Sequence, residues 1–222
     1  MRALLVCAAP LPGSAELVAR LATSADLVMA VDGGGSLCLE ARLVPDLLVG
    51  DFDSLPQAAF DELQAAGARV VQYPAEKDQT DLELALDLAR KNGVDSVTVT
   101  AASSGRLDHT LAALGALARA ADMRPRLLEP ELQAWILSAT DRAILDLRGQ
   151  GATLSLMAIG RDAVVSVSGT RWFLDHHILH CCSGLGLGNA ITDERLARVT
   201  VHDGVVAVLA PQLDVSVHVT EY

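Results

Sequence analysis

The chain has 222 residues, which is enough for one large or two small domains with a substantial core. Its net charge of −11 argues against a nucleic-acid surface, because phosphate contacts require clustered lysine and arginine side chains. No apolar run is as long as a membrane span, so we expect no membrane partner. Hydrophobic residues make up 51% of the chain and aromatic residues only 3%, so the core must be built mainly from alanine, valine and leucine.

The first nine residues combine one arginine with a short apolar stretch, which fits either an export signal or a buried first strand. We favour the strand, because the stretch is short and a loop signature follows at residues 10–13. The four cysteines have no C-x-x-C spacing, and the adjacent pair, Cys181 and Cys182, rarely forms a structural disulfide. A reducing, cytoplasmic location is therefore expected.

Residues 3–129 alternate short apolar runs with helical patterns, which is typical of a parallel sheet covered by helices on both faces. The expected strands are residues 4–8, 27–31, 47–49, 68–72, 94–100 and 126–128. The expected helices are residues 15–22, 36–42, 56–66, 81–92 and 108–121. Open sheets of this kind bind ligands at the carboxyl ends of their strands, so the loops that follow the strands are the candidate sites.

Beyond about residue 133, apolar alternation replaces the helical period. The expected strands are residues 153–159, 163–168, 171–174, 196–202, 205–209 and 213–219. Asp203-Gly204 is a preferred pair for a hairpin turn between two of them. The sequence therefore predicts a Rossmann-like α/β domain at residues 1–130 and a smaller antiparallel β-sandwich at residues 131–222.

Two carboxylates, Asp51 and Asp53, follow the apolar run that ends at Gly50. If the extended backbone continues past Gly50, both side chains point to the same side, and two oxygen donors there suit Mg²⁺. An acidic strand end is often only a solvated turn, so this pair is a weak signal by itself.

The loop before the fourth expected helix carries more charge than a simple turn needs. Thr80 and Glu83 have the spacing of a capping box, which places Asp81 in the first helical turn, where the helix dipole stabilises a carboxylate. That structural account does not explain Lys77 and Asp78, which precede the cap.

Two other loops suggest phosphate binding. Asp32-Gly33-Gly34-Gly35 would permit positive φ angles and close approach of a ligand, although its spacing matches neither a Walker loop nor a dinucleotide fingerprint. Gly105 and Arg106 would place a guanidinium beside backbone N–H donors, with Asp108 as N-cap of the next helix. Taken alone, Asp108 is more typical of a cap than of a catalyst, and His109 of a packed or solvent-facing residue.

The acidic loops together with Lys77 and Arg106 supply carboxylates for Mg²⁺ and cations for phosphate oxygens. Phosphoryl or diphosphoryl transfer needs these groups, because its catalysis is mainly positioning and charge neutralisation.

These motifs resemble those of the thiamine pyrophosphokinase family, in order and at suitable spacing. The similar segments are Asp32-Gly33-Gly34, Pro45-Asp46 with Gly50 to Ser54, Lys77 to Glu83, and Gly105 to His109. Thr170 to Leu174 and Gly188-Asn189 lie where the family has its aromatic segment and its Ser-Asn pair.

The resemblance implies transfer of the β,γ-diphosphate of ATP to the hydroxyethyl oxygen of thiamine, giving thiamine diphosphate and AMP. It implies that Asp51, Asp53 and Asp81 hold Mg²⁺ and take part in catalysis with Lys77. The nucleotide would contact Asp32, Gly33, Asp78, Thr80, Gly105, Arg106, Asp108 and His109. Trp172 and Asn189 would hold thiamine, and a homodimer would share its sites between subunits.

The sequence departs from the family pattern at Ser103 and Ser104, at Ala113 and at Gly188. A thiamine- or nucleotide-binding protein without turnover, and a diphosphokinase for another alcohol such as a pterin, are therefore alternatives. A phosphatase of the haloacid dehalogenase type would use Asp51 as nucleophile, but it would need a further acidic pair late in the chain.

A separate cluster of histidines and cysteines could bind Zn²⁺ or copper. Its members are His176, His177, His180, Cys181 and Cys182. In a strand, however, their side chains would alternate between the two faces.

Overall fold

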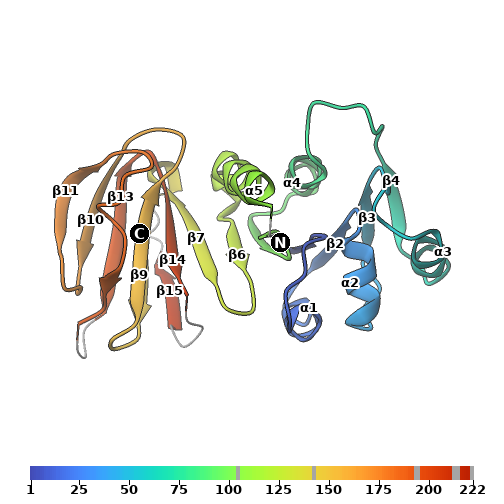
Figure 1. The fold of residues 1–222 in the computed structure, drawn as a ribbon, viewed down its shortest axis with the longest axis horizontal. Helices are drawn as coiled ribbons and strands as arrows, with labels where there is room; N and C mark the ends of the chain where they lie inside the picture. The colour runs from blue at the N-terminus through green and yellow to red at the C-terminus, as the bar shows by residue number, and fades with distance from the viewer. Residues whose placement is uncertain (104–105, 142–143, 193–195, 212–215, 221–222) are drawn as a thin grey trace. The chain divides into compact units, whose positions relative to one another are not determined.

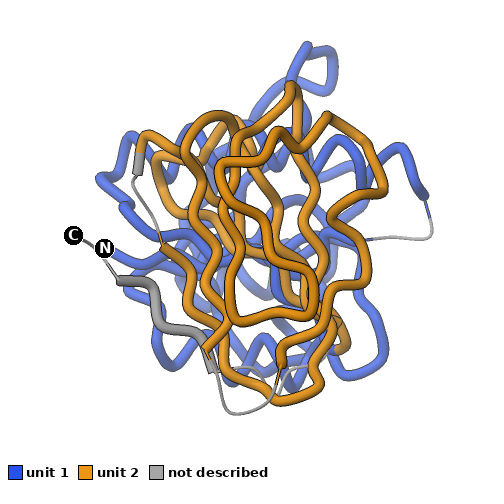
Figure 2. The backbone as a smooth tube through the Cα atoms, turned by 90° about the vertical axis from the view of Figure 1, so that its left-hand side faces the viewer, with its two compact units in different colours: residues 1–116, 127–130 blue, residues 117–126, 131–222 orange. Residues whose placement is uncertain are grey.

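The computed structural model describes residues 1–103, 106–141, 144–192, 196–211 and 216–220. The chain divides into two compact units, residues 1–116 with 127–130 and residues 117–126 with 131–222 (Figure 2). The first unit is an α/β domain, a sheet with helices between its strands, and the second is built from antiparallel strands. This arrangement confirms the predicted fold class. None of the described helices is both long and apolar enough to cross a membrane.

The sheet of the first unit has the strand order β6-β5-β1-β2-β3-β4 (Figure 1). Strands β1 to β5 run parallel, so their carboxyl ends lie at the same edge. The strands are β1 (Arg2–Val6), β2 (Leu27–Val31), β3 (Leu47–Gly50), β4 (Arg69–Gln72), β5 (Ser96–Thr100) and β6 (Arg126–Leu128). The helices are α1 (Ser14–Ala22), α2 (Gly34–Glu40), α3 (Gln57–Ala65), α4 (Asp81–Lys91) and α5 (Leu107–Arg119). Each predicted strand and helix of this region is confirmed, with small shifts at the ends.

Alternation along the buried strands divides the core of the first unit between the two faces of the sheet. On one face a single apolar cluster joins the strands to α1, α2 and α3; its buried members include Leu4, Val6, Val28, Ala30, Leu48, Val18, Leu37, Cys38 and Leu63. The intervening residues Leu5, Met29 and Val49 are also fully buried, and α4 contacts β2 and β3. Helices on both sides of the sheet leave the strand ends as the exposed edge.

The glycines after β2 serve packing more than ligand access. None of Gly33, Gly34 and Gly35 has a positive φ; the left-handed residue of this loop is Asp32, with φ 48°. A Cβ on Gly34 would lie 2.0 Å from the carbonyl oxygen of Val6 in β1. The start of α2 can therefore approach the backbone of β1 only because Gly34 has no side chain.

The second unit is a sandwich of two antiparallel sheets, β12-β9-β14-β7 and β11-β10-β13-β8-β15. Its strands are β7 (Gln133–Ser138), β8 (Ile144–Arg148), β9 (Thr153–Ala158), β10 (Ala163–Ser168), β11 (Leu174–Leu179), β12 (Asn189–Ala190), β13 (Ala197–Asp203), β14 (Val205–Ala210) and β15 (Ser216–Thr220). Two short 3₁₀ turns, Ala121–Met123 and Ala139–Asp141, also belong to this unit. One hydrophobic cluster, which contains Leu145, Leu156, Val165, Val199 and Val208, joins the inner faces of both sheets.

Three details of this unit differ from the sequence predictions. The predicted hairpin at Asp203-Gly204 is wrong, because β13 pairs with β10 and β8 while β14 pairs with β9 and β7. Gly204, with φ 82°, is instead the corner at which the chain passes from one sheet to the other. The strand expected at 171–174 begins at Leu174 and continues through the histidines to Leu179. Strands β7 and β8 and the two-residue strand β12 were not predicted; all of β7 is buried, so it lacks apolar alternation.

The close contact between α2 and β1 predicts that Gly34→Ala destabilises the fold by more than ~4 kcal/mol, because the new methyl group would overlap a backbone carbonyl that cannot rotate away. Urea unfolding measures the effect. Gly184→Ala is the matched control, since a Cβ there meets only a leucine methyl group at 3.9 Å and should change stability by less than about 1 kcal/mol. Equal stability of the two variants would contradict this account of the packing.

Candidate active site

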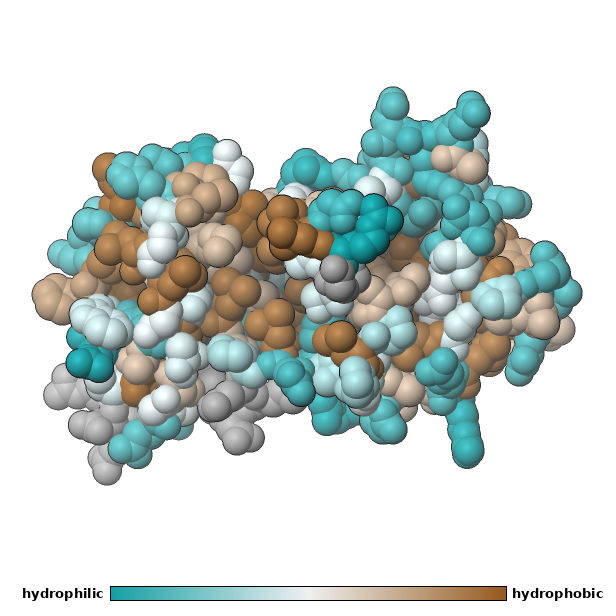
Figure 3. Space-filling view, viewed as in Figure 1, coloured by the Kyte–Doolittle hydropathy of each residue, from teal (hydrophilic) through white to brown (hydrophobic). Residues whose placement is uncertain are grey.

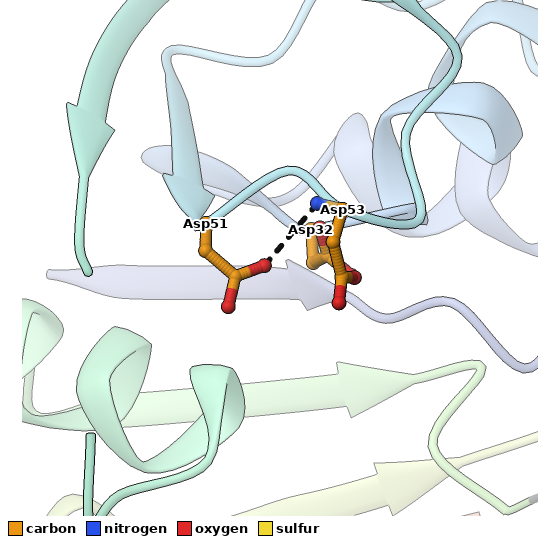
Figure 4. Close-up of side chains that lie close together, drawn as sticks. All are labelled: Asp32, Asp51 and Asp53. Atoms are coloured by element: carbon orange, nitrogen blue, oxygen red, sulfur yellow. Dashed lines mark hydrogen bonds between the residues drawn. The ribbon is translucent and has the colours of Figure 1, made fainter. Parts of the chain in front are cut away.

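Asp51 and Asp53 are brought together by a turn and not by continued extended backbone. Strand β3 ends at Gly50, and Phe52 has a left-handed conformation with φ 65°. The Oδ1 atom of Asp51 accepts a hydrogen bond of 3.2 Å from the backbone N–H of Asp53 (Figure 4). The expectation that both carboxylates lie close together therefore holds, but its geometric reason was wrong.

Asp32, at the end of β2, completes a group of three carboxylates. One oxygen from each of Asp32, Asp51 and Asp53 lies within 4.8 Å of the others (Figure 4). Asp32 is held in place by two hydrogen bonds: its N–H donates to the carbonyl of Val49 at 2.8 Å, and its Oδ2 accepts from the hydroxyl of Ser54. Its other oxygen, Oδ1, is buried and has no hydrogen-bond partner among the described residues.

This group fits a divalent cation. Three carboxylates at such short distances repel one another unless a positive charge lies among them, and Mg²⁺ prefers oxygen donors. The buried Oδ1 atom of Asp32 is the stronger observation, because a buried polar atom without a partner is costly. A bound cation would satisfy that atom.

Lys77 connects Asp51 to Asp81 at the same edge of the sheet. Its Nζ lies 2.5 Å from Oδ2 of Asp51 and 3.2 Å from Oδ1 of Asp81, and all three side chains are largely shielded from solvent. The hydrogen bond from Lys77 lowers the pKa of Asp51. Burial raises the pKa of Asp81 in spite of the opposing effect of Lys77. Burial lowers the pKa of Lys77, but the two carboxylates outweigh it and the net change is upward.

Gly50 allows Asp32 and Asp81 to approach the end of β3. Its φ is 150°, and a Cβ at this position would lie 3.1 Å from the Cβ of Asp32 and 3.2 Å from Oδ1 of Asp81. The acidic side chains from the ends of β2 and β3 and from the start of α4 therefore surround one backbone position. The sequence grouped Asp81 with Asp51 and Asp53, whereas the structure places Asp32 nearest that pair and Asp81 against Lys77.

The start of α4 has the predicted capping box. Thr80 Oγ1 accepts from the N–H of Glu83 at 3.3 Å, and Glu83 Oε2 accepts from the N–H of Thr80 at 2.7 Å. This cap fixes the first turn and with it Asp81. Asp78 is exposed in the loop between β4 and α4, over which hydrophilic residues gather (Figure 3).

The loop after β5 differs from the expected phosphate cradle. Arg106 and Asp108 form an exposed ion pair of 2.7 Å that lowers the pKa of Asp108 to about 2. Asp108 lies inside the first turn of α5 and is not its N-cap, because α5 begins at Leu107. His109 is exposed in the same turn, and Gly105 lies outside the described residues.

Glu129, which sequence reasoning did not single out, occupies the backbone donors of this loop. Its carboxylate accepts from the N–H groups of Ala101, Ala102 and Ser103 at 2.9–3.0 Å. In the sequence, Glu129 is a single acidic residue that directly follows an apolar strand and precedes Pro130. We interpreted this pattern as a domain boundary.

In the second unit, Asn189 binds the segment that carries Trp172. The Oδ1 atom of Asn189 accepts from the N–H of Trp172 at 3.2 Å, and its Nδ2 donates to the carbonyl of Trp172 at 2.7 Å. Asn189 is buried, whereas 54% of Trp172 is exposed. The guanidinium of Arg171 lies 4.8 Å from the centre of the Trp172 ring, so the indole already attracts a cation.

The histidine and cysteine cluster does not converge on one point. The rings of His176 and His202 stack at 3.9 Å, His180 pairs with Asp162, and the sulfur atoms of Cys181 and Cys182 are 3.7 Å apart. Within the described part of the chain, no three ligand atoms of this cluster lie within 4.8 Å of one another.

Comparison with known proteins identifies the family. Residues 18–128, half of the chain, match the family model described as "Thiamin pyrophosphokinase, catalytic domain". A thiamine pyrophosphokinase from Bacillus subtilis is 39% identical over 85 residues, which cover 38% of this chain and 40% of the relative. Thiamine pyrophosphokinase 1 from Arabidopsis thaliana is 26% identical over 170 residues, which cover 72% of this chain and 64% of the relative. The matches thus span less than two thirds of each of these relatives.

Solved structures show the same fold. The crystal structure of thiamine pyrophosphokinase from Bacillus subtilis superposes with a TM-score of 0.79 at 20% identity and covers 96% of this chain and 100% of that one. The enzyme from Candida albicans gives a TM-score of 0.78 at 14% identity, with coverage of 95% and 89%. The family match includes the residues from Asp32 to Asp108 that form the candidate site and argues against the phosphatase alternative. The chain belongs to the thiamine pyrophosphokinase family.

Proposed function

We propose that this protein is a thiamine pyrophosphokinase, which transfers the β,γ-diphosphate of ATP to the hydroxyethyl oxygen of thiamine. The oxygen attacks the β-phosphorus, the bond from that phosphorus to the α-phosphate oxygen breaks, and AMP leaves as the hydroxyl proton is lost. The observation that carries the proposal is the convergence of Asp32, Asp51, Asp53 and Asp81 around Gly50 and Lys77, inside the segment that matches the family.

The residues at this edge have complementary tasks. Lys77 and Arg106 supply positive charge for phosphate oxygens, which is the main requirement of diphosphoryl transfer. Asp81 holds Lys77 from the rigid first turn of α4, so that the ammonium group remains at the acidic edge. Thr80 fixes that turn, and Asp78, Asp108 and His109 lie exposed at loops where they can contact the nucleotide.

Mg²⁺ would be held by Asp32, Asp51 and Asp53, with Asp81 and Lys77 beside them. When bound, it would neutralise charge on the phosphate oxygens and act as a Lewis acid. The residues fit this ion because their donors are carboxylate oxygens and because one buried oxygen of Asp32 lacks a partner.

Thiamine would bind in the sandwich of residues 131–222, and the nucleotide in the α/β domain of residues 1–130. The exposed indole of Trp172 is suited to the thiazolium cation, since its ring already attracts the Arg171 guanidinium. Asn189 uses its amide to hold the backbone at Trp172, so its contribution is to position the indole. A homodimer that shares its sites between subunits is part of the proposal, by analogy with the family.

The departures from the family pattern are compatible with turnover. Gly188 has φ 69°, a conformation that glycine adopts more easily than serine, and its N–H donates to Ser155. Ala113 is buried in α5, and the N–H of Ser103 donates to Glu129. Ser104 lies outside the described residues.

Asp81→Asn should lower the rate of thiamine-dependent AMP release by ~100-fold or more, because the amide leaves Lys77 without one of its two carboxylate partners. A coupled AMP-release assay with thiamine and Mg-ATP measures this loss. Asp87→Asn on the exposed side of the same helix is the matched control and should retain its activity. Full activity in Asp81→Asn would remove this residue from the site, and AMP release only with a pterin alcohol would reassign the substrate.

Asp32→Asn should weaken divalent-cation binding by ~10-fold or more, because it removes a ligand charge whose oxygen is buried without another partner. Titration with Mn²⁺, followed by electron paramagnetic resonance, reports binding independently of turnover. Asp61→Asn, at an exposed position of α3, should bind Mn²⁺ as the unmodified protein does. Equal affinity in both variants would exclude Asp32 from the cation site.

Trp172→Ala should raise the KM for thiamine about tenfold and leave the KM for ATP unchanged, because the proposal assigns the exposed indole to the thiazolium cation and not to the nucleotide. Steady-state kinetics with each substrate varied in turn separates the two constants. A rise in the KM for ATP alone would contradict the assignment of the thiamine site.

A further inference from the structure

Glu129 is a fully buried carboxylate at the end of β6, where its burial requires an explanation. Removing a carboxylate from water is costly unless the charge is compensated. Burial raises its pKa, while the N–H groups of Ser103, Ala102 and Ala101 and the hydroxyl of Ser103 oppose the change. The chain therefore compensates this charge with hydrogen bonds from one short segment, residues 101–103.

Three successive N–H groups that point at one anion form a nest, the arrangement with which loops commonly bind phosphate. Here the nest is filled by the chain's own side chain, with N···O distances of 2.9–3.0 Å. A phosphate group cannot use the same donors while Glu129 is in place. The carboxylate thus ties residues 101–103 to the end of β6.

The loop needs such support, because Ala101 has a left-handed conformation with φ 55°. This conformation is energetically unfavourable for a residue with a Cβ. The conformation persists only where the surrounding structure enforces it. The carbonyl of Ala101 also accepts from the N–H of Ala9, so the loop is held from the end of β1 as well. Glu129 supplies the larger part of this restraint, with three backbone hydrogen bonds.

The loop lies close to the proposed site in two ways. Arg106 and Asp108 follow Ser103 by three and five residues along the chain. The segment after β1 also links the two places. The N–H of Ala9 donates to the carbonyl of Ala101 at 2.8 Å, and a Cβ on Gly33, the residue after Asp32, would lie 3.1 Å from the Cβ of Ala8.

We propose that Glu129 is a positioning residue for the nucleotide: it fixes residues 101–103 and thereby the place of Arg106 and Asp108 relative to ATP. This inference rests on the proposed function, since it concerns the ATP site of that activity. It assigns no contact between Glu129 and either substrate.

Glu129→Gln tests the proposal, because the amide keeps the shape but replaces one acceptor oxygen by an N–H₂ group that faces backbone donors. The KM for ATP should rise about tenfold while the KM for thiamine changes less than twofold. Glu131→Gln, the same change at an exposed position two residues later, is the matched control and should match the unmodified protein. Thermal unfolding of each variant, measured in parallel, records any loss of stability.

Glu129→Asp provides the second variant if the glutamine variant does not fold. It keeps the charge but shortens the reach, so the KM for ATP should rise to a lesser extent, about threefold. A KM for ATP equal to that of Glu131→Gln, in whichever of the two variants folds, would overturn the positioning role and leave Glu129 a structural residue. An unmodified protein that releases no AMP with thiamine would instead overturn the proposed function, and with it the role of Glu129.

Discussion

Carboxylates from three loops repel one another at one edge of the parallel sheet. Asp32, Asp51 and Asp53 lie within 4.8 Å of one another, and Asp81 lies beside them against Lys77. One lysine cannot balance four carboxylates, so the folded chain retains an excess of negative charge that a divalent cation can relieve. The parallel sheet supplies the rigidity that keeps these groups together in the absence of that cation.

The loops at this edge obtain their shape from residues in unusual conformations. Asp32, Phe52 and Ala101 each follow a parallel strand and each has a left-handed backbone. Such residues reverse the chain within one or two positions and direct side chains or N–H groups back toward the strand ends. Each is stabilised by a specific contact: Ser54 for Asp32, the Asp51 to Asp53 hydrogen bond for Phe52, and Glu129 for Ala101. Among the described residues, three of the seven non-glycine residues with a positive φ thus lie at this edge of the sheet.

Periodicity in the sequence was sufficient to predict the elements of the first unit, because its strands are buried apolar runs separated by amphipathic helices. The capping box at Thr80 was predictable from two residues, since it depends only on local spacing. The pairing of Asp32 with the Asp51 loop was not predictable, because it depends on strand order and on the turn at Phe52. The same limit applies to β7, which is buried throughout, and to Glu129, whose partners lie 26 to 28 residues away.

Crystallography with Mn²⁺ and ATP would show whether Asp32, Asp51 and Asp53 form one cation site. Anomalous scattering locates Mn²⁺ independently of any assumption about the protein. We expect a peak within about 2.2 Å of carboxylate oxygens from these residues, a distance typical of small divalent cations. A peak elsewhere, or bound ATP with no peak at this edge of the sheet, would contradict it.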